Sequence, residues 1–250
     1  MLKIISKAIS KVTLALLVSV LAFGMTFNDV MAAWTGTDSF ESGYTNGADI
    51  AGIDGGTGFG AWAGNTEFNG NSVTPIVGAM GVLAVATDAG GNVSRPLDSV
   101  TTSGVMRIAC RRSLKTTGTF ICADWRDNAV TTLVTVRFGT ADLVILGATS
   151  QTLISDYSIA TVYYVDMKYN TGTNSYQARA CATAPCTVEA YSTAVGRVDT
   201  LDTGIGSIGV RCSSDCSGTV EFDAISDGEA VAGGSSTAKP QKSAMLRRRR

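Results

Sequence analysis

The sequence predicts an all-β fold, an antiparallel sandwich of two sheets. Short apolar runs rich in Val, Ile, Thr and Tyr alternate with Gly, Asn, Asp and Ser along the body of the chain, which is the pattern of strands separated by turns. After residue 33, no stretch has the sustained 3.6-residue period of an amphipathic helix. The expected strands fill one large domain without an internal linker or repeat.

The strands are expected in this order: 76–85, 104–111, 119–125, 131–138, 142–146, 152–158, 161–169, 175–180, 187–191, 205–210 and 219–225. Two connections are predicted to be tight turns. Residues 169–174 (YNTGTN) place Asn and Gly where a hairpin needs a positive φ angle, and residues 138–141 (FGTA) form a second turn.

The first 32 residues have the pattern of an export signal. Lys3, Lys7 and Lys11 precede an apolar run over residues 14–25, and Val30-Met31-Ala32 fits a cleavage site before Ala33. The run is shorter than the ~20 residues of a membrane span, although an uncleaved anchor is the alternative. We therefore expect a signal peptide at 1–32, a β-sandwich domain at 33–228 and a secreted or cell-surface protein.

Charge divides the chain into three parts. Of its 20 basic residues, three lie in the first 32 positions and six in the last 15, so residues 33–235 hold 11 basic against 20 acidic residues, about −9. An acidic body repels phosphate backbones, so the folded domain is not expected to bind nucleic acid. The chain has no histidine, which excludes Ser–His–Asp and Cys–His catalytic sets and His-based metal centres.

Six cysteines, an even number in an exported chain, predict disulfides. Cys110 and Cys122 would face each other across a hairpin in which opposite residue numbers sum to 232, and the segments CATAPC and CSSDC predict the local bridges Cys181–Cys186 and Cys212–Cys216. A metal site is the alternative, but these spacings lack a zinc-finger pattern.

Three segments carry a family resemblance. Residues 38–62 (DSFESGYTNGADIAGIDGGTGFGAW), 163–181 (YYVDMKYNTGTNSYQARAC) and 219–225 (TVEFDAI) resemble the opening, the middle hairpin and the closing strand of LamG-like, concanavalin A-type jelly-roll domains of exported bacterial proteins. Ser226-Asp227 departs from the pattern by lacking the final apolar residue. The resemblance implies a jelly-roll sandwich, in a family that includes glycan-binding modules, adhesion modules and glucanases.

The glucanases of this fold use a strand motif with two Glu residues flanking an Asp, because alternate positions share one face of a strand. Glu221 and Asp223 match the first two acids, but Ile225 and Ser226 supply no third. Without that acid/base residue the retaining mechanism fails, so Glu221 and Asp223 are weak catalytic candidates. They are expected on a solvated or loop-anchoring face, with Phe222 packed inward.

A binding face is the stronger functional hypothesis. In the same expected hairpin, Arg107 lies opposite Trp125, and Asp124 and Arg126 flank the indole. An indole stacks on sugar rings and the charged neighbours bind hydroxyl groups, so these four residues would form a glycan platform. In the alternative, Trp125 lies in the sandwich core while the Arg107 side chain reaches the rim.

A structural calcium ion is a further candidate partner. Asp and Asn in the turns at Asp124, Asp127, Asn128, Asp199 and Asp202 suggest a structural calcium ion, although such residues are also ordinary turn formers. No other cofactor is expected.

After Asp227 the chain becomes a flexible basic tail over 229–250. Lys239, Lys242 and Arg247–Arg250 would contact an anionic surface or would simply be solvated. The sequence thus predicts a non-catalytic extracellular recognition module for carbohydrate. A glycoside hydrolase or polysaccharide lyase and a structural surface protein are the alternatives.

Overall fold

The computed structural model describes residues 36–64, 68–73, 75–78, 81–86, 91–115, 118–127, 131–184, 186, 189–199, 204–213 and 218–227. The predicted signal peptide and basic tail lie outside these residues, as do Asn128, Asp202 and Cys216. Within the described part of the chain, no helix is long and apolar enough to span a membrane.

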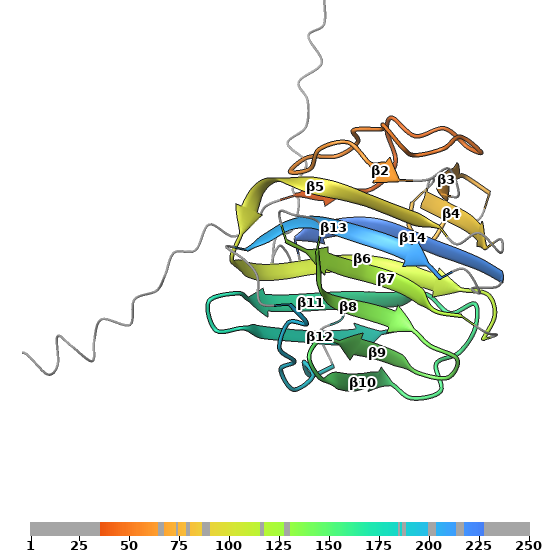
Figure 1. Ribbon diagram of the computed structural model, residues 1–250. Coiled ribbons are helices and arrows are strands. Elements are labelled where there is room, and N and C mark those ends of the chain that lie inside the picture. Colours follow the sequence, from red (N-terminus) through yellow and green to blue (C-terminus); the bar gives the residue numbers. More distant parts are fainter. Residues whose placement is uncertain are drawn as a thin grey trace, which may run out of the picture.

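Two antiparallel sheets pack face to face and confirm the predicted all-β jelly-roll sandwich (Figure 1). Sheet I runs in the order β12 (Ser175–Cys181), β11 (Tyr163–Asn170), β6 (Ser103–Arg112), β14 (Gly218–Asp227), β4 (Gly81–Ala86) and β3 (Phe68–Asn71), with β1 (Thr37–Asp38) also paired to β14. Sheet II runs in the order β10 (Ser150–Ile154), β9 (Leu143–Leu146), β8 (Thr132–Phe138), β7 (Phe120–Arg126), β13 (Ile205–Cys212), β5 (Asn92–Thr101) and β2 (Ala63–Gly64).

Most strands lie at or near their expected positions, and both predicted turns are confirmed. Asn174 adopts a φ of 51° at the end of the β11–β12 turn, and the Gly139 amide donates to the Asp142 carbonyl between β8 and β9. The expected strands did not include β5, which contains Pro96, a residue that sheets accept only at edges and irregular positions. Pro96 is accommodated because β2 pairs only with Val93 and Ser94. Residues 189–191 were expected to be extended and are not a strand.

The expected hairpin containing Cys110 and Cys122 is wrong, although their disulfide is present. β6 pairs with β11 and β14 in sheet I, whereas β7 pairs with β8 and β13 in sheet II. The chain therefore crosses from one sheet to the other between β6 and β7, as Greek-key connections do. The bridge spans the core between the facing sheets, with a Cα–Cα distance of 6.1 Å.

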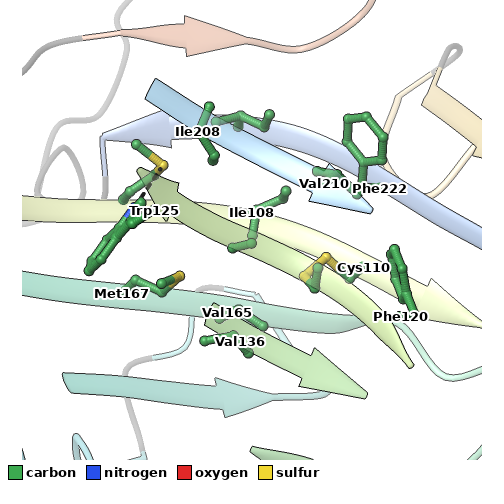
Figure 2. Packing of buried hydrophobic residues seen from close by; sticks show 14 of the residues in the cluster. Ile108, Cys110, Phe120, Trp125, Val136, Val165, Met167, Ile208, Val210 and Phe222 are labelled. Carbon is green, nitrogen blue, oxygen red and sulfur yellow. Dashed lines mark hydrogen bonds between the residues drawn. A yellow bond between two sulfur atoms is a disulfide. The ribbon is translucent and has the colours of Figure 1, made fainter. Parts of the chain in front are cut away.

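Trp125 lies in this core, between the two sheets (Figure 2). Its side chain is fully buried, its Nε1 donates to the Met106 sulfur at 3.5 Å, and its ring packs against Tyr169 with centroids 4.7 Å apart. Since Met106 and Tyr169 belong to sheet I, the indole of β7 points across the interface. Strand alternation then directs Asp124 and Arg126 away from the core, to the outer face of sheet II.

The Gly-rich N-terminal segment is attached to β5 by one buried arginine. Arg95 donates to Asp38 at 2.5 Å and to the Gly55 carbonyl at 2.8 Å, and its guanidinium lies 4.2 Å from the centroid of the Phe59 ring. Asp38 also accepts a hydrogen bond from the Tyr44 hydroxyl. Burial, reinforced by Asp38, raises the pKa of Tyr44 far above its ordinary value. These contacts give the opening segment a structural role.

Candidate functional site

A group of charged side chains lies on the outer face of sheet I, built from three adjacent strands. In β11, Val165 and Met167 point into the core, so Asp166 between them points outward. The register places Asp166 directly opposite Arg107 of β6 on one side and Arg179 of β12 on the other. One carboxylate therefore stands between two guanidinium groups.

The geometry of this group is that of a charge-assisted clamp. Arg107 reaches Asp166 through Nε at 2.5 Å and Nη2 at 2.8 Å, and Arg179 reaches it through Nε at 3.0 Å and Nη2 at 2.9 Å. The carboxylate is fully buried, and the hydrogen bonds that Arg107 donates to Asp166 raise the pKa of Arg107 above its ordinary value. Such paired, hydrogen-bonded charges hold their side chains in one orientation.

An aromatic ring and a third cation adjoin the clamp. The ring centroid of Tyr191 lies 4.6 Å from the guanidinium carbon of Arg179 and 5.8 Å from the ammonium nitrogen of Lys168, both within cation–π range. Gln177 holds the Tyr191 segment against β12 by donating to the Ser192 carbonyl at 2.8 Å. Arg107, Asp166, Lys168, Arg179 and Tyr191 are called the sheet I cluster below.

A second charged pair lies further along the same face. Arg111 of β6 pairs with Glu221 of β14, and this hydrogen bond raises the pKa of Arg111 above its ordinary value. Asn71 of β3 approaches the same carboxylate with its Nδ2 at 3.5 Å. Cross-strand polar contacts thus extend across sheet I from β12 to β3.

Asp223 on β14 is a buried acid held by main-chain groups. It accepts hydrogen bonds from the amides of Val77 at 2.8 Å and Ala224 at 2.7 Å, and its side chain is fully buried. Burial raises the pKa of Asp223 to about 7, with a smaller contribution from Glu41 and an opposing one from the backbone hydrogen bonds. The carboxyl anchors the 75–78 segment to the sheet.

The two weak catalytic candidates are therefore placed as follows. Phe222 packs in the core between the sheets, as expected, so Glu221 and Asp223 share the outer face. Of the two environments expected for them, a solvated or a loop-anchoring face, the second is present at Asp223, and both side chains are buried. Glu221 is engaged by Arg111 in an ion pair.

The predicted glycan platform of Arg107, Trp125, Asp124 and Arg126 is not assembled. Trp125 is buried in the core, Arg107 lies on the outer face of sheet I, and Asp124 and Arg126 pair with each other on the outer face of sheet II at 2.8 Å. The prediction failed because β6 and β7 belong to different sheets, so the expected cross-strand neighbours never meet.

Sequence reasoning missed Asp166, Lys168, Arg179 and Tyr191. A signal for the first three was present in the predicted hairpin over 163–181, because its turn fixes which residues face each other. Counting back from the turn places Asp166 opposite Arg179, as the structure has them. Tyr191 lies outside any strand and has no comparable signal.

The predicted calcium sites gain no support from the described residues. Asp124 is engaged by Arg126 and by Thr132, and Asp127 caps the Thr131 amide. No group of three or more acidic or Cys side chains suited to a metal ion gathers in the described part of the chain. Asn128 and Asp202 lie outside it.

Two of the three predicted disulfides are present in the structure, Cys110–Cys122 and Cys181–Cys186. Cys212 is buried and is not a free thiol. Its predicted partner Cys216 lies outside the described residues, so the third pairing stays a prediction. Disulfides are typical of proteins that fold in an oxidising compartment, which accords with export.

No family model and no curated protein matches the sequence, so the LamG-like resemblance stays a prediction. Solved structures with a similar fold include "Cellulose induced protein, Cip1", at 16% identity and a TM-score of 0.45, with 76% of this chain and 95% of that chain covered. "Alginate lyase AlgAT5 from Polysaccharide Lyase family 7" has 11% identity and a TM-score of 0.41, with 58% and 75% covered.

A "Sialidase" matches with 10% identity and a TM-score of 0.46 over 65% of this chain, which spans 16% of the sialidase's length. The activities in these names are those of the matched proteins. The fold of this chain rests on its own strand pairing.

Proposed function

We propose that this protein is an extracytoplasmic recognition module that binds carbohydrate on the outer face of sheet I, over the strands β6, β11 and β12. The observation that carries the proposal is the sheet I cluster itself. It presents oriented guanidinium groups, an exposed ammonium and a half-buried aromatic ring side by side. These are the groups that bind sugar hydroxyls and cover the apolar face of a sugar ring.

The rigidity of the cluster supports binding. Its two arginines are already fixed on Asp166, and Gln177 fixes the segment that carries Tyr191. A ligand that docks on groups already held in place loses less side-chain entropy than one that must order them. A recognition role needs no further residue at this face, whereas the catalytic alternative needs an acid/base pair that the Glu221 and Asp223 positions do not supply.

Arg179→Gln tests this proposal, with Arg211→Gln as its matched control. Arg179 belongs to the sheet I cluster, and Arg211 lies 3.7 Å from Asp124 in an arginine–carboxylate group on the opposite face. In a polysaccharide panel read by retention on immobilised glycans, we expect Arg179→Gln to weaken binding about tenfold and Arg211→Gln to leave it unchanged. The proposal is wrong if no polysaccharide is retained or if both variants bind equally well.

A further inference from the structure

Resting on the proposed function, we infer that the ligand of the sheet I cluster is an acidic glycan, one whose sugars carry carboxylate or sulfate groups. The cluster has three cations, Arg107, Lys168 and Arg179, around one carboxylate, Asp166. The exposed side chain of Glu189 lies nearby, and even with its charge counted, a positive charge remains. This surplus stands on a body of about −9.

The arginines keep hydrogen-bond donors beyond those that Asp166 occupies. Asp166 takes Nε and Nη2 of both Arg107 and Arg179, which leaves the Nη1 group of each directed elsewhere. The Nη1 of Arg179 also reaches the Glu189 carbonyl at 3.4 Å, a long contact. Both side chains remain partly accessible, at 13% and 18% exposure. Guanidinium donors of this kind match the oxygens of carboxylate and sulfate.

Lys168 adds a mobile cation beside these fixed ones. Its side chain is exposed and its ammonium nitrogen lies over the Tyr191 ring, 5.8 Å from the centroid, so its flexible stem is able to follow an anionic group along a glycan while the arginines stay in place. The tyrosine ring supplies an apolar surface for the sugar that carries the charge. A neutral sugar would use the ring and some donors but would leave the surplus positive charge unmatched.

The acidic body of the protein also limits how densely charged the ligand is expected to be. A DNA duplex carries one negative charge per about 1.7 Å of its axis, and these phosphates would meet the repulsion of the surrounding acidic surface. A glycan with one carboxylate or sulfate per sugar brings fewer negative charges to the small cationic cluster than the duplex does. The cluster therefore selects an acidic polysaccharide over a phosphate polymer.

Lys168→Gln in the full chain tests this inference, with Arg137→Gln as the matched control. Arg137 lies on the outer face of sheet II, where it pairs in register with Ile121 and Val144, so both substitutions remove one positive charge from an exposed sheet face. The probes are polygalacturonate, dextran sulfate, neutral dextran and duplex DNA, each titrated at 50 and 300 mM NaCl.

We expect polygalacturonate or dextran sulfate to bind more tightly than dextran and DNA, and the tighter of the two identifies the anionic group. Lys168→Gln should weaken that binding about fivefold at low salt, Arg137→Gln should not, and salt should reduce the difference. Dextran binding as tightly as the acidic polymers would overturn the acidic preference and leave the proposed function standing. Equal binding of DNA, or equal losses in both variants, would also overturn the inference. Failure of every glycan to bind would overturn the proposed function itself.

Discussion

The two outer faces of the sandwich each hold a buried carboxylate paired with arginine, in different surroundings. On sheet I, Asp166 is clamped between Arg107 and Arg179. On sheet II, Asp124 is clamped by Arg126 at 2.8 Å and approached by Arg211 at 3.7 Å. Both carboxylates are fully buried, but Asp166 faces its two arginines on neighbouring strands, whereas Asp124 and Arg126 lie on the same strand, β7. The carboxylate of sheet I therefore ties three neighbouring strands together, whereas that of sheet II reaches a neighbouring strand only through the longer contact with Arg211.

The two clamps differ in the side chains that surround them. Arg126 packs over Gly209, where an added Cβ would come within 2.7 Å of Nη2, and it donates to Asn92. The Thr132 hydroxyl also donates to the Asp124 carboxylate. The sheet I clamp instead adjoins Tyr191 and Lys168. Cationic charge occurs on both faces, so the aromatic ring beside fixed donors, rather than charge alone, is the reason that sheet I is proposed as the binding face.

The largest expected effect is a loss of stability from a substitution in the core, which leaves both outer faces intact. Trp125→Ala removes a fully buried indole and leaves a cavity between the sheets, which should lower the free energy of unfolding by about 4 kcal/mol. Urea denaturation measures this loss. Glycan binding by the fraction that stays folded should be unchanged. An unchanged urea midpoint together with a loss of glycan binding would instead mean that Trp125 belongs to the binding site.

The next effect compares the clamps directly. Asp166→Asn and Asp124→Asn each leave two arginines without their carboxylate, and each should cost about 3 kcal/mol of stability because an unpaired buried charge is expensive. Only Asp166→Asn should also weaken glycan binding, since it releases Arg107 and Arg179. Urea midpoints and glycan retention, measured on the same preparations, test this. Equal binding losses would mean that the two faces do not differ in function.

The smallest effect concerns Asp223, the acid on sheet I that backbone amides rather than arginines hold. Its pKa is about 7 in the folded chain and 3.8 ordinarily, so the folded state binds the extra proton between these values. Stability should therefore fall by about 2 kcal/mol as the pH rises from 5 to 7.

Asp223→Asn should flatten this slope, and thermal unfolding at several pH values measures it. The chain has no histidine, so few other side chains titrate in this window. An unchanged slope in the variant would assign the pH dependence to other groups.

The hairpin over β11 and β12 shows how much of the candidate site was predictable. Strand alternation and the turn at 169–174 together place Asp166, Lys168 and Arg179 on one face, and both features are local in the sequence. Arg107 could not be added in this way. It is 59 residues from Asp166, and no local pattern states that β6 lies beside β11 rather than beside β7.

The sequence by itself determined the all-β class, the Cys181–Cys186 pairing and the inward or outward direction of most strand residues, because alternation and turn chemistry act over a few residues. The Cys110–Cys122 pairing was predicted from a hairpin that does not form, and the bridge instead joins the two facing sheets. Only the tertiary structure decided which sheet each strand joins. Strand partners far apart in the chain are selected when two sheets bury their apolar faces against each other. That choice placed Trp125 in the core and brought Arg107, Asp166 and Arg179 together on one outer face.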